Sequence, residues 1–189
     1  VSIENYRSIK NLTLDDLQLV NLVFGKTNVA KTSILEAILL LSSPCKPDTI
    51  LRANHNRGVG IVNTDIFKSF FYRLDISNPV KLKGELKNKE KRDFEIHPRK
   101  PDAFEFKNDK ETILEGLNFK ATLKKDGDKA TREVLSGLTI INGSVEFIAP
   151  RDYIHEYHKV FLNTINDLNV ILSQTYSNLN VLFVKKQLD

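Results

Sequence analysis

The amino-acid sequence predicts an α/β protein with a strand–loop–helix unit, a β-rich lobe and C-terminal helices. A largely apolar strand over residues 17–24 is followed by a short loop and by a helix that is apolar almost all round. Residues 79–149 alternate apolar with charged side chains in short segments, which indicates a mixed or antiparallel sheet. From residue 150, apolar residues recur at helical spacing. We therefore expect three parts, 1–78, 79–149 and 150–189.

Local signals place further elements in the first part. Residues 1–6 have the pattern of the end of a strand, and residues 12–14 begin another. The apolar helix is expected to be buried and to end before Pro44, because proline cannot continue a helix. Asp48 is a candidate N-cap for the short helix that follows. Residues 64–74 place apolar side chains at helical spacing and predict one more helix.

The β-rich lobe contains two turn signals and many lysines. Asp126-Gly127 and Asn142-Gly143 are typical hairpin turns. In the stretch 81–100 the lysines and arginines are interleaved with acidic residues, which favours a solvated sheet face over a nucleic-acid track. In the last part we expect a helix from Asp152 and a strand over residues 181–184.

The composition indicates a globular protein of a reducing compartment. The chain has 189 residues, 41% of them hydrophobic and 28% charged, with a formal net charge of +4. This mild positive charge permits contact with nucleic acid without requiring it. Cys45 is the only cysteine, and no apolar run reaches the length of a membrane span. We expect a cytoplasmic protein with no membrane partner.

The most informative segment of the chain is residues 22–33, which fit a phosphate-binding loop with one departure. Gly25, Lys31 and Thr32 match the pattern G-x-x-x-x-G-K-[ST], but Ala30 occupies the place of the second glycine. In such a loop the backbone N–H groups and the helix N-terminus face an anion, the lysine neutralises phosphates, and the hydroxyl takes a magnesium position. Ala30 is harmless if its φ is negative and costly if the loop needs a positive φ. The alternative is an ordinary strand–loop–helix connection with a solvated lysine.

Two further segments carry a family resemblance. Residues 3–11, Ile-Glu-Asn-Tyr-Arg-Ser-Ile-Lys-Asn, resemble the start of RecF/SMC/OLD-type ABC ATPase heads, and Ser33 to Ile38 resemble the helix that follows their phosphate loop. The nearest relatives are AAA-type ATP-binding proteins akin to the OLD family. A looser similarity continues through Arg52 and through Arg57-Gly58. The resemblance implies the N-terminal lobe of an ABC-type P-loop NTPase, with ATP and Mg²⁺ as cofactors.

Carried over residue by residue, the resemblance implies a nucleotide site at the loop. Thr32 would hold the metal, and Arg7 would meet a phosphate or the ribose unless it is a solvated turn residue. Thr27, Val29 and Ala30 depart from the family pattern. The residues implied to bind nucleotide are Gly25, Asn28, Ala30, Lys31, Thr32, Ser33, Arg7 and Ser8.

The sequence assigns no catalytic residue. Such ATPases also need a signature motif and an apolar strand ending in Asp-Glu, but Val181–Val184 leads into Lys185-Lys186. We therefore expect the chain to be the first lobe of a longer ATPase, a nucleotide-dependent switch in DNA repair or phage defence. The resemblance implies a homodimer with ATP sandwiched between heads and allows a nuclease or other effector, or nucleic acid, as partner. The alternatives are a degenerate, non-hydrolysing interaction module and a nucleic-acid-binding β module.

Two histidines in the last part of the chain resemble a metal-binding pair. His155 and His158 are three residues apart, whereas the zinc motif H-E-x-x-H needs a spacing of four. The sequence therefore favours two polar positions that flank Tyr157 over a metal site.

Overall fold

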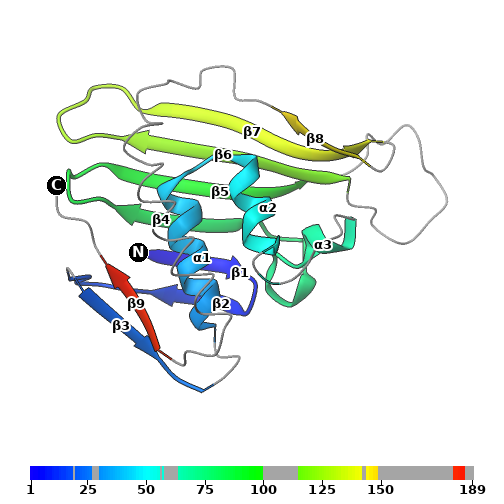
Figure 1. Ribbon diagram of the computed structural model, residues 1–189. Coiled ribbons are helices and arrows are strands. Elements are labelled where there is room, and N and C mark those ends of the chain that lie inside the picture. Colours follow the sequence, from blue (N-terminus) through cyan, green and yellow to red (C-terminus); the bar gives the residue numbers. More distant parts are fainter. Residues whose placement is uncertain are drawn as a thin grey trace.

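A seven-stranded antiparallel sheet is the largest unit of the protein (Figure 1). The computed structural model describes residues 1–18, 20–26, 30–55, 57, 64–99, 115–141, 144–148 and 181–185. The order in the sheet is β2-β1-β4-β5-β6-β7-β8. Its strands are β1 (Ser2–Tyr6), β2 (Ile9–Thr13), β4 (Val80–Glu85), β5 (Lys91–Arg99), β6 (Gly116–Lys124), β7 (Arg132–Ile141) and β8 (Ser144–Ile148).

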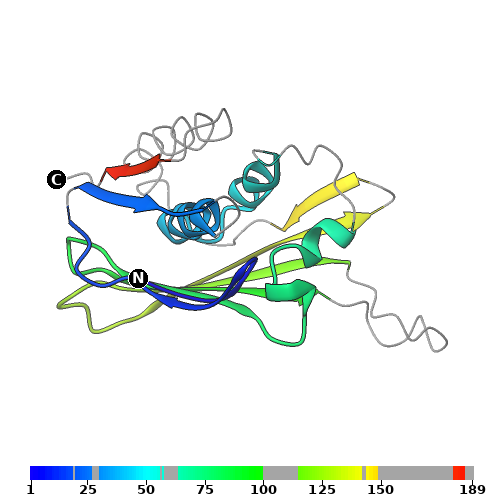
Figure 2. The same cartoon turned by 90° about the horizontal axis from the view of Figure 1, so that it is seen from below.

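A smaller sheet carries the strand that precedes the candidate phosphate loop. It pairs β3 (Val20–Phe24) with β9 (Val181–Lys185) in antiparallel register, with Leu22 opposite Phe183. Figure 2 shows that this small sheet lies on the same side of the large sheet as the two longer helices. The loop therefore starts above the large sheet and not within it.

Helices α1 (Lys31–Ser42) and α2 (Pro47–His55) cover one face of the large sheet (Figure 2). Leu35, Leu39 and Leu40 of α1 are at most 1% exposed and belong to the core. The helix approaches β4 closely because residue 84 is glycine, where an added Cβ would lie 2.5 Å from Leu41 Cδ2. Shorter pieces follow as α3 (Thr64–Lys68) and the 3₁₀ turn η1 (Tyr72–Leu74). Within the described ranges, no helix has the length and apolarity that crossing a bilayer requires.

Several predicted elements are confirmed. The buried helix after the loop is α1, whose buried residues include Ile34, Ala37 and Leu41. Strands β4, β5, β6 and β7 pair antiparallel in this order, Asp126-Gly127 lies in the turn between β6 and β7, and β7 pairs with β8, with Ile141 opposite Ser144. The expected strand at residues 181–184 is β9. The architecture is thus a strand-rich combination of α and β elements.

The structure corrects the prediction that the strand before the loop is buried. Val20, Leu22 and Phe24 of β3 are 58%, 50% and 75% exposed, whereas the alternating Val23 packs against the core. An apolar run predicts burial only if both faces are covered, and one face of β3 is not covered within the described residues.

Two predicted helices have different bounds. The helix expected over residues 64–74 ends at Lys68 and is followed by a turn, and Leu74 is 60% exposed. The short second helix starts at Pro47, so Asp48 lies inside its first turn and is not the N-cap. Proline suits this first position because its missing N–H has no intrahelical partner there. The helix expected from Asp152, with His155 and His158, lies outside the described residues.

The large sheet also runs across the predicted boundary between residues 78 and 79. β1 comes from the first predicted part and β4 from the second, yet they pair directly, with Ile3 opposite Leu82. Ile3, Leu82 and α1 share one hydrophobic core.

Candidate phosphate-binding loop and its ion-pair network

Lys31 folds back over the loop that connects β3 to α1. Its Nζ donates hydrogen bonds to the carbonyl oxygens of Gly25, at 2.7 Å, and Lys26, at 2.6 Å. The ammonium is therefore bonded to the loop backbone, in contacts that lie at the surface of the protein. Residues 27–29, which include the predicted Asn28, lie outside the described part of the chain.

Ala30 adopts the left-handed conformation that favours glycine. It is the N-cap of α1 with φ 64° and ψ 2°, and its carbonyl accepts the first helical hydrogen bond from the Ile34 N–H at 2.9 Å. An L-residue with a side chain loses about 1–2 kcal/mol in this conformation relative to its favoured regions. The loop therefore needs the positive φ that glycine supplies in the motif, and Ala30 adopts it at a cost.

The first turn of α1 brings Ser33 beside Ser8. Thr32 is half-buried, and Ser33 is 3% exposed. The Ser33 Oγ lies 3.4 Å from the Ser8 Oγ and accepts a hydrogen bond from Arg57 Nη2 at 3.1 Å. The structure thus places two predicted site residues, Ser8 and Ser33, in contact at the start of α1.

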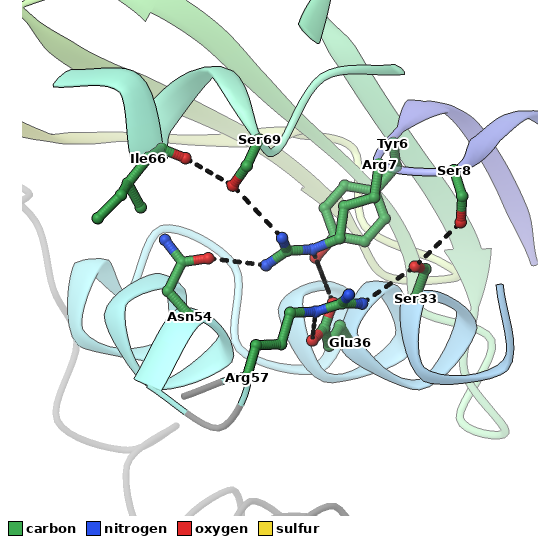
Figure 3. A network of polar contacts seen from close by, with 9 residues as sticks. All are labelled: Tyr6, Arg7, Ser8, Ser33, Glu36, Asn54, Arg57, Ile66 and Ser69. Carbon is green, nitrogen blue, oxygen red and sulfur yellow. Dashed lines mark hydrogen bonds and ion pairs between the residues drawn. The ribbon is translucent and has the colours of Figure 1, made fainter. Parts of the chain in front are cut away.

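Arg7 belongs to a network of polar contacts (Figure 3). Its side chain is 7% exposed, and its Nε lies 2.7 Å from Glu36 Oε2. Its Nη2 donates to Asn54 Oδ1 at 2.9 Å, and the guanidinium lies 4.5 Å from the centre of the Phe70 ring. The interpretation of Arg7 as a solvated turn residue is therefore wrong. For Arg7 to meet a phosphate or ribose, it would have to leave Glu36.

Glu36 is the centre of this network. Its side chain is fully buried in α1, and its Oε1 and Oε2 accept hydrogen bonds from Arg57 Nε at 2.7 Å and Nη2 at 2.9 Å. The hydroxyl of Tyr6 lies 3.3 Å from Glu36 Oε2. Burial raises the pKa of Tyr6 above its usual range, and the nearby Arg7 charge opposes this increase. Two guanidinium groups, those of Arg7 and Arg57, thus bind one carboxylate.

The sequence contained a signal for this network. Glu36 is the one charged residue in an otherwise apolar run, and a buried charge is stable only when it is paired and hydrogen-bonded. The sequence did not predict the partners of Glu36, because Arg7 and Arg57 are 29 and 21 residues away along the chain.

Asn54, which binds Arg7 through its side-chain oxygen, has a second polar atom in the same region. In the described structure, its Nδ2 is buried without a hydrogen-bond partner.

A second buried ion pair lies at the other end of α1. Arg92 and Glu90 are each 2% exposed, and Arg92 Nε lies 2.6 Å from Glu90 Oε1. Arg92 Nη1 also donates to the carbonyls of Leu41 and Ser42, at 3.2 and 2.7 Å. These two residues were expected on the solvated face, so the prediction is wrong for them. Arg92 instead binds the carbonyl end of the helix, where a positive charge is favourable.

His97 also has a partner in the structure. Its Nε2 lies 2.8 Å from Glu95 Oε2 on the same strand. In the part of the chain that is described, no group of three or more His, Cys, Asp or Glu residues is placed to hold a metal ion.

Comparison with known proteins gives one short similarity. Over 43 residues, 23% of this chain, the sequence is 44% identical to the uncharacterized protein MJECL10 of Methanocaldococcus jannaschii. The aligned part covers 20% of that relative, so the match spans about a fifth of its length. The chain matches no protein-family profile and no solved structure.

Proposed function

We propose that the chain is a nucleotide-binding lobe of the ABC ATPase class that takes ATP with Mg²⁺ at the loop between β3 and α1. The single observation that carries the proposal is the position of Lys31. Lys31 is the first residue of α1, and its ammonium is bonded to the loop carbonyls of Gly25 and Lys26. A cation beside the first turn of a helix is the arrangement that binds phosphate.

The first turn of α1 supplies the other groups that a phosphate needs. The N–H groups at a helix start have no intrahelical partner, so those of Lys31, Thr32 and Ser33 are available donors. Arg57 lies beside this turn, where its Nη2 donates to the Ser33 Oγ at 3.1 Å. The Thr32 hydroxyl is our candidate for the one protein ligand of Mg²⁺, with phosphate oxygens and water as the others.

The proposal includes a biological role for the nucleotide-binding lobe. Nucleotide binding would switch the lobe between states in DNA repair or phage defence, through a homodimer with ATP between two heads and a nuclease or other effector. We assign no catalytic residue to the described part of the chain. The argument for this role is the resemblance of residues 3–11 and of the helix after the loop.

Isothermal titration calorimetry with ATP and Mg²⁺ tests this function. We expect the wild type to bind and Lys31→Ala to bind at least about tenfold more weakly, a loss of about 1.4 kcal/mol. Lys10→Ala is the matched control, since Lys10 is exposed on β2 and should leave the affinity unchanged. Absence of binding to the wild type, or equal binding by Lys31→Ala, would overturn the proposal.

A degenerate lobe that acts as an interaction module is the second candidate. The strained Ala30 favours it, because the methyl group stands where the motif has glycine. The exposed Val20, Leu22 and Phe24 favour it too, since an apolar strand face is a typical contact surface. Under this candidate neither wild type nor Ala30→Gly binds ATP in the calorimeter.

A further inference from the structure

The ends of two hairpins form one surface away from the phosphate loop. Lys91 at the start of β5 is directly opposite Lys124 at the end of β6. Lys89, in the turn between β4 and β5, lies with its Nζ 3.7 Å from Asp126 Oδ2, in the turn between β6 and β7. The two turns are therefore side by side, at the left end of the sheet in Figure 1.

We name the exposed charged residues of 85–91 and 124–132 the hairpin-end patch. Seven of these side chains are positive and three are negative, an excess equal to the formal charge of +4 for the whole chain. The patch therefore holds much of the basic character of the protein. Its members are Lys87, Lys89, Lys91, Lys124, Lys125, Lys129 and Arg132, with Glu85, Asp126 and Asp128.

Two lysines of the patch face each other across the sheet. Like charges directly opposite each other destabilise a sheet, and Lys91 faces Lys124 in this way. Glu85 lies 4.0 Å from Lys91, but Lys124, Lys125 and Lys129 form no ion pair with any described residue. The negative charges of a polyanion would reduce the repulsion between these lysines, which the neighbouring acidic residues do not fully cancel.

The patch borders a hollow of about 520 Å³. The charged residues that line it are Lys125, Lys129 and Arg132, with the acidic Glu90 and Asp128. The cations outnumber the acidic residues in this hollow, so its lining has the same sign of charge excess as the patch.

We propose that the hairpin-end patch binds the sugar–phosphate backbone of nucleic acid without reading the base sequence. None of the large hydrophobic side chains that are exposed among the described residues, such as Phe24 or Leu135, lies in the patch. An apolar anchor for a membrane surface and aromatic rings for base stacking are therefore missing from this part of the described chain. The patch can therefore bind a ligand mainly through its positive charge, and charge dominates the non-specific binding of proteins to a duplex.

Fluorescence anisotropy with a labelled duplex of random sequence, measured without nucleotide over a series of salt concentrations, tests the proposal. The test variant is the double substitution Lys124→Gln and Lys125→Gln, and the control is Lys10→Gln with Lys83→Gln, two exposed lysines outside the patch. We expect the test variant to bind about tenfold more weakly or worse, with the salt dependence of log K lower by about two. The control should keep the wild-type slope.

Three results would overturn the proposal. These are no binding of duplex by the wild type, equal losses in test variant and control, and lysine-dependent binding of anionic phosphatidylserine vesicles with no binding of the duplex. Circular dichroism establishes that each variant is folded. Lys31→Ala should bind the duplex like the wild type, so this test stands apart from that of the phosphate loop.

Discussion

At Ala30 the backbone takes a conformation that most residues avoid. The φ of 64° follows from the path of the chain, which must turn from the end of β3 into the first turn of α1. The motif G-x-x-x-x-G-K-[ST] has glycine at this position, but the sequence left the sign of φ open. The structure shows that Ala30 adopts the positive φ despite its side chain.

Ala30→Gly should raise the free energy of unfolding by roughly 1 kcal/mol, because glycine adopts this φ without the steric cost of a Cβ. Urea denaturation measures the change. The same substitution at Ala37, which is buried in the middle of α1, should lower stability by about 1 kcal/mol or more. Destabilisation by both substitutions would contradict the strain at Ala30.

Cys45 makes stability depend on pH in alkaline solution. Burial raises the pKa of its thiol from 9.0 to about 12. The unfolded chain therefore loses this proton near pH 9, whereas the folded chain keeps it, so stability is complete below pH 9 and falls as pH rises toward 12. The raised pKa of Tyr6 adds a loss of the same sign at higher pH.

We expect Cys45→Ala to lose less stability than the wild type between pH 9 and pH 10, by up to about 1.4 kcal/mol per pH unit. Urea denaturation at each pH measures both slopes. Removal of the Sγ contact to the Val134 carbonyl shifts all values for the variant by one constant, so the slopes remain comparable. Identical slopes would show that the thiol titrates normally in the folded protein.

At the scale of the elements, hydrophobic periodicity predicted most of the helices and strands. It did not predict which neighbouring elements pack on their faces. The alternation in β6 and β7 and the apolar character of α1 identify these elements because each buries a continuous face. The apolar β3 was predicted to be buried, yet Leu22 and Phe24 are half or more exposed. Burial of a strand depends on its neighbours in space, which local sequence does not specify.

Glu36 links three elements, α1, the β1–β2 turn and the segment after α2. Glu36→Gln should lower the free energy of unfolding by about 3 kcal/mol, because the nearly buried guanidinium of Arg7 loses its counter-charge. Glu85→Gln is the matched control and should change stability little, since its partner Lys91 lies 4.0 Å away at the surface. Equal, small effects in urea denaturation would mean that the network adds nothing to stability.

For the whole molecule, the sequence predicted the loop and the residues that flank it, but not the network beneath it. Arg7, Glu36, Asn54, Arg57 and Ser69 come together from segments far apart in the chain (Figure 3). Contacts of this kind arise from the packing of α1 and α2 on the large sheet and have no local signature. The predicted boundary after residue 78 rests on a change in composition. The large sheet continues across this boundary, because β1 and β4 pair and share one core.

Competition for bound ATP tests the central claim, that the β3–α1 loop is a phosphate site, most directly. In this measurement a fluorescent ATP analogue is bound with Mg²⁺ and then displaced by tripolyphosphate or by adenosine. The proposed site would bind phosphate through Lys31 and the start of α1 and not the base, so we predict that tripolyphosphate displaces the analogue and adenosine does not. Displacement by adenosine alone, or no binding of the analogue at all, would contradict the claim.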